Sequence, residues 1–136
     1  MSFNLNVLID GKLLSMTADS IPFKNLSFKA NMLTNVFEIS ITEDIVILTT
    51  EYSSEDKINA NNIDAYDYNG NHLWNIADIV GDVGTAFGGA VLTTAKLLEL
   101  DLDCNGPLLS CTAFDSRTFI IDINSRKLLL TRKIKN

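Results

Sequence analysis

Short segments in which apolar and polar residues alternate, separated by turn signals, constrain this chain more than any other feature. Such alternation predicts β-strands with one buried face, because successive side chains of a strand point to opposite faces. Asp10-Gly11 ends the first segment, and residues 12–17 return, which predicts a hairpin with a type I′ turn. The apolar residues of the first segment share one face: Phe3, Leu5, Val7 and Ile9.

A second block predicts a pair of strands over residues 35–41 and 45–50, joined by a turn at residues 42–44. The return strand begins Ile45-Val46-Ile47-Leu48, which is apolar on both faces. This pattern is typical of a central strand that is covered on both sides. The polar stretch of residues 52–62 predicts an exposed loop.

The clearest hairpin signal is Asn69-Gly70, between arms at residues 62–68 and 71–76. A type I′ turn needs positive φ at both central residues, which Asn and Gly tolerate. Aromatic residues occur on both arms and favour cross-strand pairing. We therefore expect a β-hairpin that turns at these two residues.

The second half of the chain is less regular at first. Residues 77–89 contain four glycines, and we expect a loop or a short bulged strand there. Ala90–Leu100 is ambiguous: its leading β-branched residues favour a strand, although its apolar spacing also suits a helix. Further hairpin arms are predicted over residues 108–114, 118–123 and 127–132.

About ten short strands at regular spacing predict an all-β fold, an antiparallel meander whose blade-like sheets form a small sandwich or open barrel. The chain has 136 residues, of which 46% are hydrophobic. This length is close to the commonest domain size, and it allows a substantial core. We therefore predict a single domain over residues 1–136.

The N-terminus has neither the basic region nor the continuous apolar region of a secretory signal, and no apolar run is long enough to span a membrane. We therefore expect a cytoplasmic protein without a membrane partner. In that compartment Cys104 and Cys111 are expected as reduced, partly buried thiols, with a disulfide between them as the alternative.

Charge is unevenly distributed in this chain, whose net charge is −6. Between Glu38 and Asp103 there are 13 acidic residues and two basic ones, whereas residues 117–136 contain six basic residues and one acidic residue. The acidic stretch is either a solvated surface or a face that attracts a basic protein. Nucleic acid is not expected as a partner, because phosphate binding requires a basic surface.

Two segments resemble the blade repeats of quinoprotein-like β-propellers. In residues 63–76, Asp67, Gly70, Leu73 and Trp74 match the repeat's outer hairpin, and residues 114–129 are similar to the next hairpin of such an array. Two blades cannot close a propeller ring, so the resemblance implies either an oligomer or a blade-like sheet that curls into a small sandwich. We favour the sandwich, and no quinone cofactor is implied.

Candidate catalytic and metal-binding residues are few. Asp101–Gly106 matches the opening of a calcium loop, but position twelve is Thr112 where an EF-hand needs glutamate. His72 is the only histidine, and we interpret it as a surface or packing residue. Asp64 and Asp67 fall on opposite faces of their strand by parity, which argues against a catalytic pair. No cofactor and no metal are predicted.

These observations favour a non-enzymatic protein-binding module. Its concrete form would be an immunity-type protein that neutralises a basic toxin domain such as a nuclease; bacterial immunity proteins resemble this chain in general character, being small, acidic and poor in motifs. The alternatives are a small hydrolase or sugar-binding β domain with a site at residues 81–89, and an oligomeric propeller-like scaffold. The candidate interface residues are Glu51, Glu55, Asp56, Asp64 and Asp67.

Overall fold

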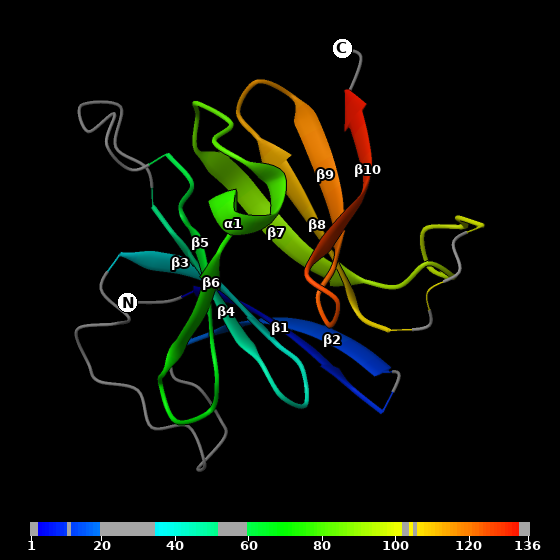
Figure 1. Cartoon of the computed structure of the whole chain (residues 1–136). Helices are drawn as coiled ribbons and strands as arrows, with labels where there is room; N and C mark the ends of the chain where they lie inside the picture. Colours follow the sequence, from blue (N-terminus) through cyan, green and yellow to red (C-terminus); the bar gives the residue numbers. More distant parts are fainter. Residues whose placement is uncertain are drawn as a thin grey trace.

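The structure is a computed structural model that describes residues 3–10, 12–19, 35–51, 60–101, 104 and 106–133. It confirms the all-β class, with ten strands and one short helix in these residues (Figure 1). The elements are β1 (Phe3–Ile9), β2 (Lys12–Ala18), β3 (Val36–Ile41), β4 (Val46–Thr50), β5 (Ile63–Tyr66), β6 (His72–Asn75), α1 (Ala77–Val80), β7 (Phe87–Thr93), β8 (Leu108–Ala113), β9 (Arg117–Asp122) and β10 (Lys127–Lys133).

The strands form two sheets, neither of which closes into a barrel. The six-stranded sheet has the order β2-β1-β3-β4-β5-β6, and the four-stranded sheet has the order β10-β9-β8-β7. All neighbouring strands are antiparallel except β1 and β3, which run parallel with Asn4 opposite Glu38. This pair departs from the predicted meander. Strand β2 runs back antiparallel to β1 and ends with Ala18 opposite Phe3, so the chain is again at the starting end of β1 before β3 begins parallel to it.

The main core lies between the two sheets, and we call the face of each sheet that packs on the other its inner face. Trp74, from β6, is 2% exposed in this core. As predicted, β4 is a central strand whose residues from Val46 to Thr49 are all buried. The inner-face core includes Ile47, Ala65 and Trp74 from the six-stranded sheet, and Leu92, Leu109 and Ile121 from the four-stranded sheet.

The opposite, outer face of the six-stranded sheet also carries buried apolar residues. Residues that are paired across neighbouring strands point to the same face of a sheet, so the strand register shows which residues lie on the outer face. Leu5 is opposite Ile39, and Ile39 is opposite Leu48, so all three share the outer face. Leu48 is opposite Asp64 on β5, so the outer face becomes polar where β5 begins.

The β5–β6 hairpin forms as predicted, but its turn is not type I′. Only Gly70 has a positive φ, of 86°, while Asn69 does not. The Gly70 N–H donates to the Asp67 carbonyl at 3.1 Å, which places the turn one residue earlier. The Asp67 carboxylate accepts from the N–H groups of Asn69 and Asn71 at 2.9 Å each, and these bonds stabilise the shifted turn.

Residues 77–100 contain three different structures. The helix α1 was not predicted, since four residues are too few to show a helical period. A bulge between Phe87 and Gly89 opens β7, consistent with the predicted bulged strand. The strand interpretation of Ala90–Leu100 is confirmed as far as Thr93, and hydrogen-bonded turns follow up to Leu100.

Asn62 joins the two sheets through its side chain. Although it ends a stretch predicted to be exposed, it is 4% exposed. Its amide donates to the carbonyls of Phe87 at 3.0 Å and Thr50 at 2.7 Å, and it accepts from the Phe87 N–H at 2.7 Å. The amide therefore pairs with Phe87 as a neighbouring strand would, at the edge of β7.

Glu38 and Ser40, both buried on the inner face of β3, make a second contact of the same kind. The Ala90 N–H donates to Glu38 Oε1 at 2.7 Å, and Ser40 Oγ donates to the Ala90 carbonyl at 3.2 Å. Asn6 donates to Glu38 Oε2 at 3.3 Å. Side chains of the six-stranded sheet thus satisfy backbone groups at two places along the free edge of β7.

Candidate binding surface

Three hairpin turns lie at the same end of the six-stranded sheet, towards the lower side of Figure 1. Strands β1 and β3 are parallel, and β5 has the same direction because both β3 and β5 are antiparallel to β4. The turns that follow these three strands therefore meet at one end. They carry four acidic residues, which we call the acidic end: Asp10, Glu43, Asp44 and Asp67.

Direct contacts join these turns. The Asp10 N–H donates to Glu43 Oε1 at 3.3 Å, which links the β1–β2 turn to the β3–β4 turn. The Tyr68 hydroxyl donates to the Thr42 carbonyl, which links the β5–β6 turn to the same place. Burial raises the pKa of Tyr68, and the nearby charges of Asp44 and Glu43 raise it further. The four carboxylates are therefore parts of one surface.

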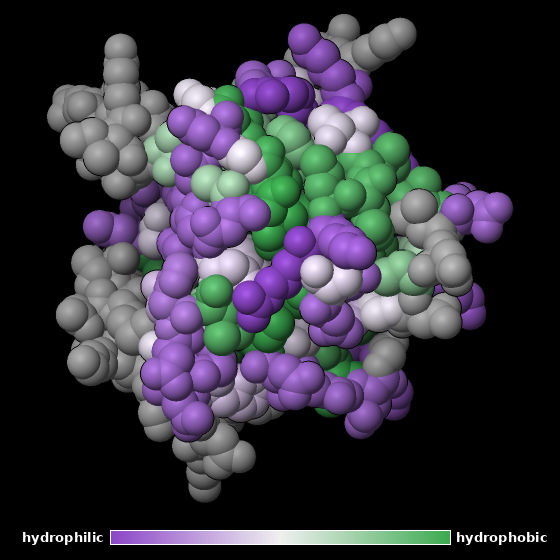
Figure 2. All heavy atoms as spheres, in the orientation of Figure 1, coloured by the Kyte–Doolittle hydropathy of each residue, from purple (hydrophilic) through white to green (hydrophobic). Residues whose placement is uncertain are grey.

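No lysine or arginine of the described residues makes an ion pair with the acidic end. Asp10, Glu43 and Asp44 are exposed, and Asp67 is half-buried. Hydrophilic residues cover the lower side of the molecule in Figure 2, where these turns lie. Unpaired carboxylates of this kind produce a negative potential that attracts cationic groups.

A surface pocket of about 200 Å³ lies where the acidic end faces the four-stranded sheet. None of its lining residues is basic. Its volume is below the roughly 300–1,000 Å³ that is typical of small-molecule sites. The pocket is large enough for one side chain of a partner. It is lined by Leu8, Asp10, Thr42, Glu43, Asp44, Thr94, Gly106, Pro107 and Asn124.

The interface residues predicted from the sequence do not form one cluster. Asp67 belongs to the acidic end, whereas Glu51 lies beyond the other end of β5. A strand rises about 3.3 Å per residue, so the four residues of β5 separate these two carboxylates by roughly 13 Å or more. Glu55 and Asp56 lie outside the described residues, and their role in binding stays a prediction.

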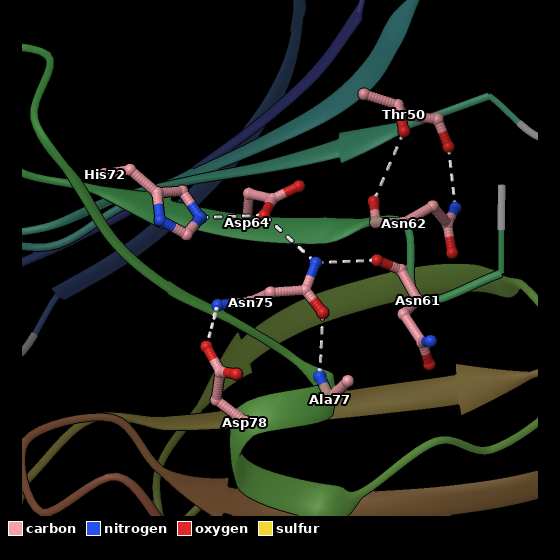
Figure 3. A network of polar contacts seen from close by, with 8 residues as sticks. All are labelled: Thr50, Asn61, Asn62, Asp64, His72, Asn75, Ala77 and Asp78. Carbon is pink, nitrogen blue, oxygen red and sulfur yellow. Dashed lines mark hydrogen bonds and ion pairs between the residues drawn. The ribbon is translucent and has the colours of Figure 1, made fainter.

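Asp64 is part of a polar network on the outer face of β5 and β6 (Figure 3). Its Oδ1 lies 2.9 Å from His72 Nε2 and accepts from Asn75 Nδ2 at 3.0 Å. Asn75 also donates to the Asn61 carbonyl at 2.8 Å and accepts from the Ala77 N–H at 2.9 Å. The network therefore positions the start of α1.

Tyr66 packs edge-on against the His72 ring of the Asp64–His72 pair, with 5.3 Å between the ring centroids. The one hydroxyl drawn in Figure 3, that of Thr50, lies 3.5 Å from the Asn62 carbonyl and makes no contact with His72. Asp64 and Asp67 use their oxygens on different partners, and Asp67 follows the end of β5. The sequence did not reveal the Asp64–His72 contact, because a pairing irregularity between Ala65 and Tyr66 shifts the register of the two arms.

Asp10, Glu43 and Asp44 are the residues that the sequence interpretation missed as binding candidates. Each follows a predicted strand, so each was interpreted only as a turn residue. The sequence does show acidic residues in the turns that follow these strands, and turns after strands of the same direction lie at the same end of a sheet. To predict that these turns meet, however, one must know the strand order, which the local alternation pattern does not contain.

Other predicted features lie apart from this surface. Gly81 and Gly84 have positive φ in the segment between α1 and β7, whereas Gly88 and Gly89 are part of β7 itself. Both cysteines are free thiols, as expected. Burial, and secondarily the charge of Glu38, raises the pKa of Cys111. Of the segment Asp101–Gly106, whose sequence matches the opening of a calcium loop, residues 102, 103 and 105 lie outside the described part.

Within the described ranges, no group of three or more His, Cys, Asp or Glu side chains is arranged to hold a metal ion. In the same ranges, no helix is both long enough and apolar enough to cross a membrane. Comparison with protein-family models, with curated proteins and with solved structures finds no match. The geometry of the described residues is therefore the basis for assigning a function.

Proposed function

We propose that this chain is a non-enzymatic protein-binding module that binds a basic partner at its acidic end. The observation that carries this proposal is the gathering of four carboxylates at one end of the six-stranded sheet, without a basic counterion among the described residues; three of them, Asp10, Glu43 and Asp44, line a small pocket. Complementary charge accelerates the encounter of two proteins and excludes partners of the wrong sign. A lysine or arginine of the partner fits the pocket by charge and by size.

The concrete form of the proposal is an immunity-type protein that acts in the cytoplasm and neutralises a basic toxin domain, such as a nuclease. A net charge of −6 supports this form, because a nuclease that binds phosphate presents a basic surface. An acidic protein can cover that surface without catalytic residues of its own. Inhibition by occlusion requires only a stable, complementary face.

The immunity form can be tested with the product of the reading frame next to this chain's gene. The product is expressed alone and together with the chain, and cell growth and nuclease activity are measured. We expect toxicity from the product alone and its suppression by the chain at equimolar amounts. A toxic neighbour that stays fully active in an excess of the chain would contradict the immunity form.

Charge reversal at the acidic end tests whether this surface binds the basic partner. We expect Glu43→Lys/Asp44→Lys to slow association with the basic partner at least roughly tenfold and to reduce its dependence on salt, because steering by charge dominates such on-rates. Both side chains are exposed, so the fold should be kept. Stopped-flow association rates over a series of salt concentrations measure the effect.

Glu55→Lys/Asp56→Lys is the matched comparison, since it changes the net charge by the same amount at two residues that the sequence alone had favoured. A smaller effect there assigns the interface to the acidic end. A larger effect there assigns it to the loop that the sequence alone had favoured. Unchanged association in both variants would contradict binding by charge complementarity.

A further inference from the structure

The two open sheets have four edge strands, and three of these are protected against pairing with another strand. Strand β10 carries Lys127, Arg132 and Lys133, and its pairing with β9 is irregular between Leu128 and Leu130. Strand β6 has four residues, and its pairing with β5 is also irregular. The edge of β7 is occupied by side chains of the other sheet, as described above. Charges, bulges, short length and covering groups are the usual protections of a sheet edge.

Strand β2 is the fourth edge, and beyond Lys12 the described part of the chain gives it none of these protections. It pairs with β1 in an unbroken register of seven residues, from Phe3 opposite Ala18 to Ile9 opposite Lys12. Lys12, at its beginning, is its only charged residue. Leu14 and Met16 are 59% and 46% exposed, and both point to the outer face of the sheet. A long, regular, uncharged edge with exposed apolar residues is a site for strand addition.

The register identifies which backbone groups of β2 are free. Two residues separate Ile9 from Lys12, and the pair that closes a two-residue hairpin is hydrogen-bonded. Antiparallel pairs alternate between hydrogen-bonded and non-hydrogen-bonded, so the N–H and C=O groups of Leu13, Ser15 and Thr17 point away from β1. These three residues are centred on Ser15.

We propose that β2 pairs in antiparallel orientation with β2 of a second copy of this chain, about a two-fold axis at Ser15. In this register Ser15 lies opposite Ser15 of the second copy, and Leu13 lies opposite Thr17 of the second copy. Every free backbone group of the three residues then meets a partner. The two six-stranded sheets become one continuous sheet.

The side chains of β2 fit the same two-fold register. Leu14 lies opposite Met16 of the second copy, and Met16 opposite Leu14 of the second copy, so each exposed apolar side chain gains an apolar neighbour. No acidic residue occurs between Lys12 and Ala18, so no carboxylate belongs to the paired strands themselves. A strand that complements itself in both backbone and side chains favours a second copy over an unrelated partner.

The acidic end contributes no residue to this contact, so the dimer and the proposed function can fail independently. Sedimentation equilibrium of the full chain over a series of concentrations tests the dimer. We expect a mass that rises towards twice the chain mass of 15.0 kDa. A single-chain mass at every concentration overturns the proposal.

Two variants that differ at one residue test the register. In Leu14→Lys/Met16→Lys, each lysine lies opposite a lysine of the second copy. In Leu14→Lys/Met16→Glu, each lysine lies opposite a glutamate. We expect the first variant to dimerise at least roughly tenfold more weakly than the second, because like charges in opposite positions destabilise a strand pair and unlike charges stabilise it.

Both positions are exposed, so circular dichroism should show the same fold for the two variants. Equal dimerisation of the two overturns the register about Ser15. Leu128→Lys on β10 is the control at another exposed edge position, and we expect it to dimerise like the unaltered chain. If this control dissociates while the β2 variants stay dimeric, the contact lies at β10 and the proposal is wrong.

Discussion

Asp67 shows how one side chain decides the geometry of a turn. The pair Asn69-Gly70 predicts a hairpin correctly, but the turn that forms begins at Asp67, whose carboxylate binds the N–H groups of Asn69 and Asn71. A type I′ turn would lack these two bonds. The sequence signal therefore located the hairpin, and a competing local hydrogen-bond acceptor selected the turn type.

The same carboxylate makes the hairpin sensitive to pH. Hydrogen bonds from the side chain and backbone of Asn71 hold the pKa of Asp67 below its usual range. A pKa that is lower in the folded state means that the ionised group stabilises the fold above its unfolded pKa of about 3.9. This contribution is lost as the pH falls through the folded pKa.

We therefore expect Asp67→Asn to be less stable than the unaltered chain at neutral pH, and equally stable near pH 2, where both side chains are uncharged. The amide keeps an acceptor for the backbone N–H groups, so the comparison isolates the charge. Urea denaturation at the two pH values measures the difference. A difference of the same size at both values would show that the charge is not its cause.

At the scale of the element, alternation located the strands, because burial on one face is a local requirement. The strand assignments over residues 3–9, 36–41 and 46–50 and in the last two hairpins follow this pattern. The alternation pattern does not predict helix α1, since the start of this helix depends on the Asn75 side chain, which accepts a hydrogen bond from the Ala77 N–H. The alternation pattern also does not predict that Asn62 joins the two sheets, because its partner Phe87 is 25 residues away in the sequence.

Asn62→Ala tests the hydrogen bonds by which the Asn62 side chain, just before β5, joins the six-stranded sheet to β7. The substitution removes the partner of the buried N–H and carbonyl of Phe87 and of the part-buried Thr50 carbonyl, and each buried group left unpaired destabilises by about 1–3 kcal/mol. We expect a loss of roughly 2–4 kcal/mol in the free energy of unfolding, measured by urea denaturation. Asn69→Ala, at an exposed position of the β5–β6 hairpin, should change stability by less than about 1 kcal/mol. Equal effects of the two substitutions would mean that water replaces the Asn62 amide.

At the scale of the whole molecule, both sheets contribute to one inner-face core, which predicts that they unfold together. Trp74 is the only tryptophan and lies in the six-stranded sheet, so its fluorescence reports on that sheet. Leu109→Ala removes a fully buried side chain from the four-stranded sheet. We expect it to lower the free energy of unfolding by about 2–5 kcal/mol.

The fluorescence and circular dichroism transitions of Leu109→Ala should shift together, because the cavity lies in the shared core. Leu128→Ala, which is 40% exposed on β10, is the control and should shift both transitions by less than about 1 kcal/mol. A Trp74 transition that stays in place while the dichroism shifts would divide the chain into two folding units.

The sequence by itself determined the all-β class, most strand positions and the central place of β4, since these follow from local alternation and from runs that are apolar on both faces. Only the tertiary structure decided the parallel pairing of β1 with β3, which joins strands that are not consecutive in the sequence and follows from no local pattern. That pairing gives β1, β3 and β5 a common direction and so assembles the acidic end. In the described residues β2 is an edge of this sheet, because it pairs only with β1 and β3 takes the place on the other side of β1.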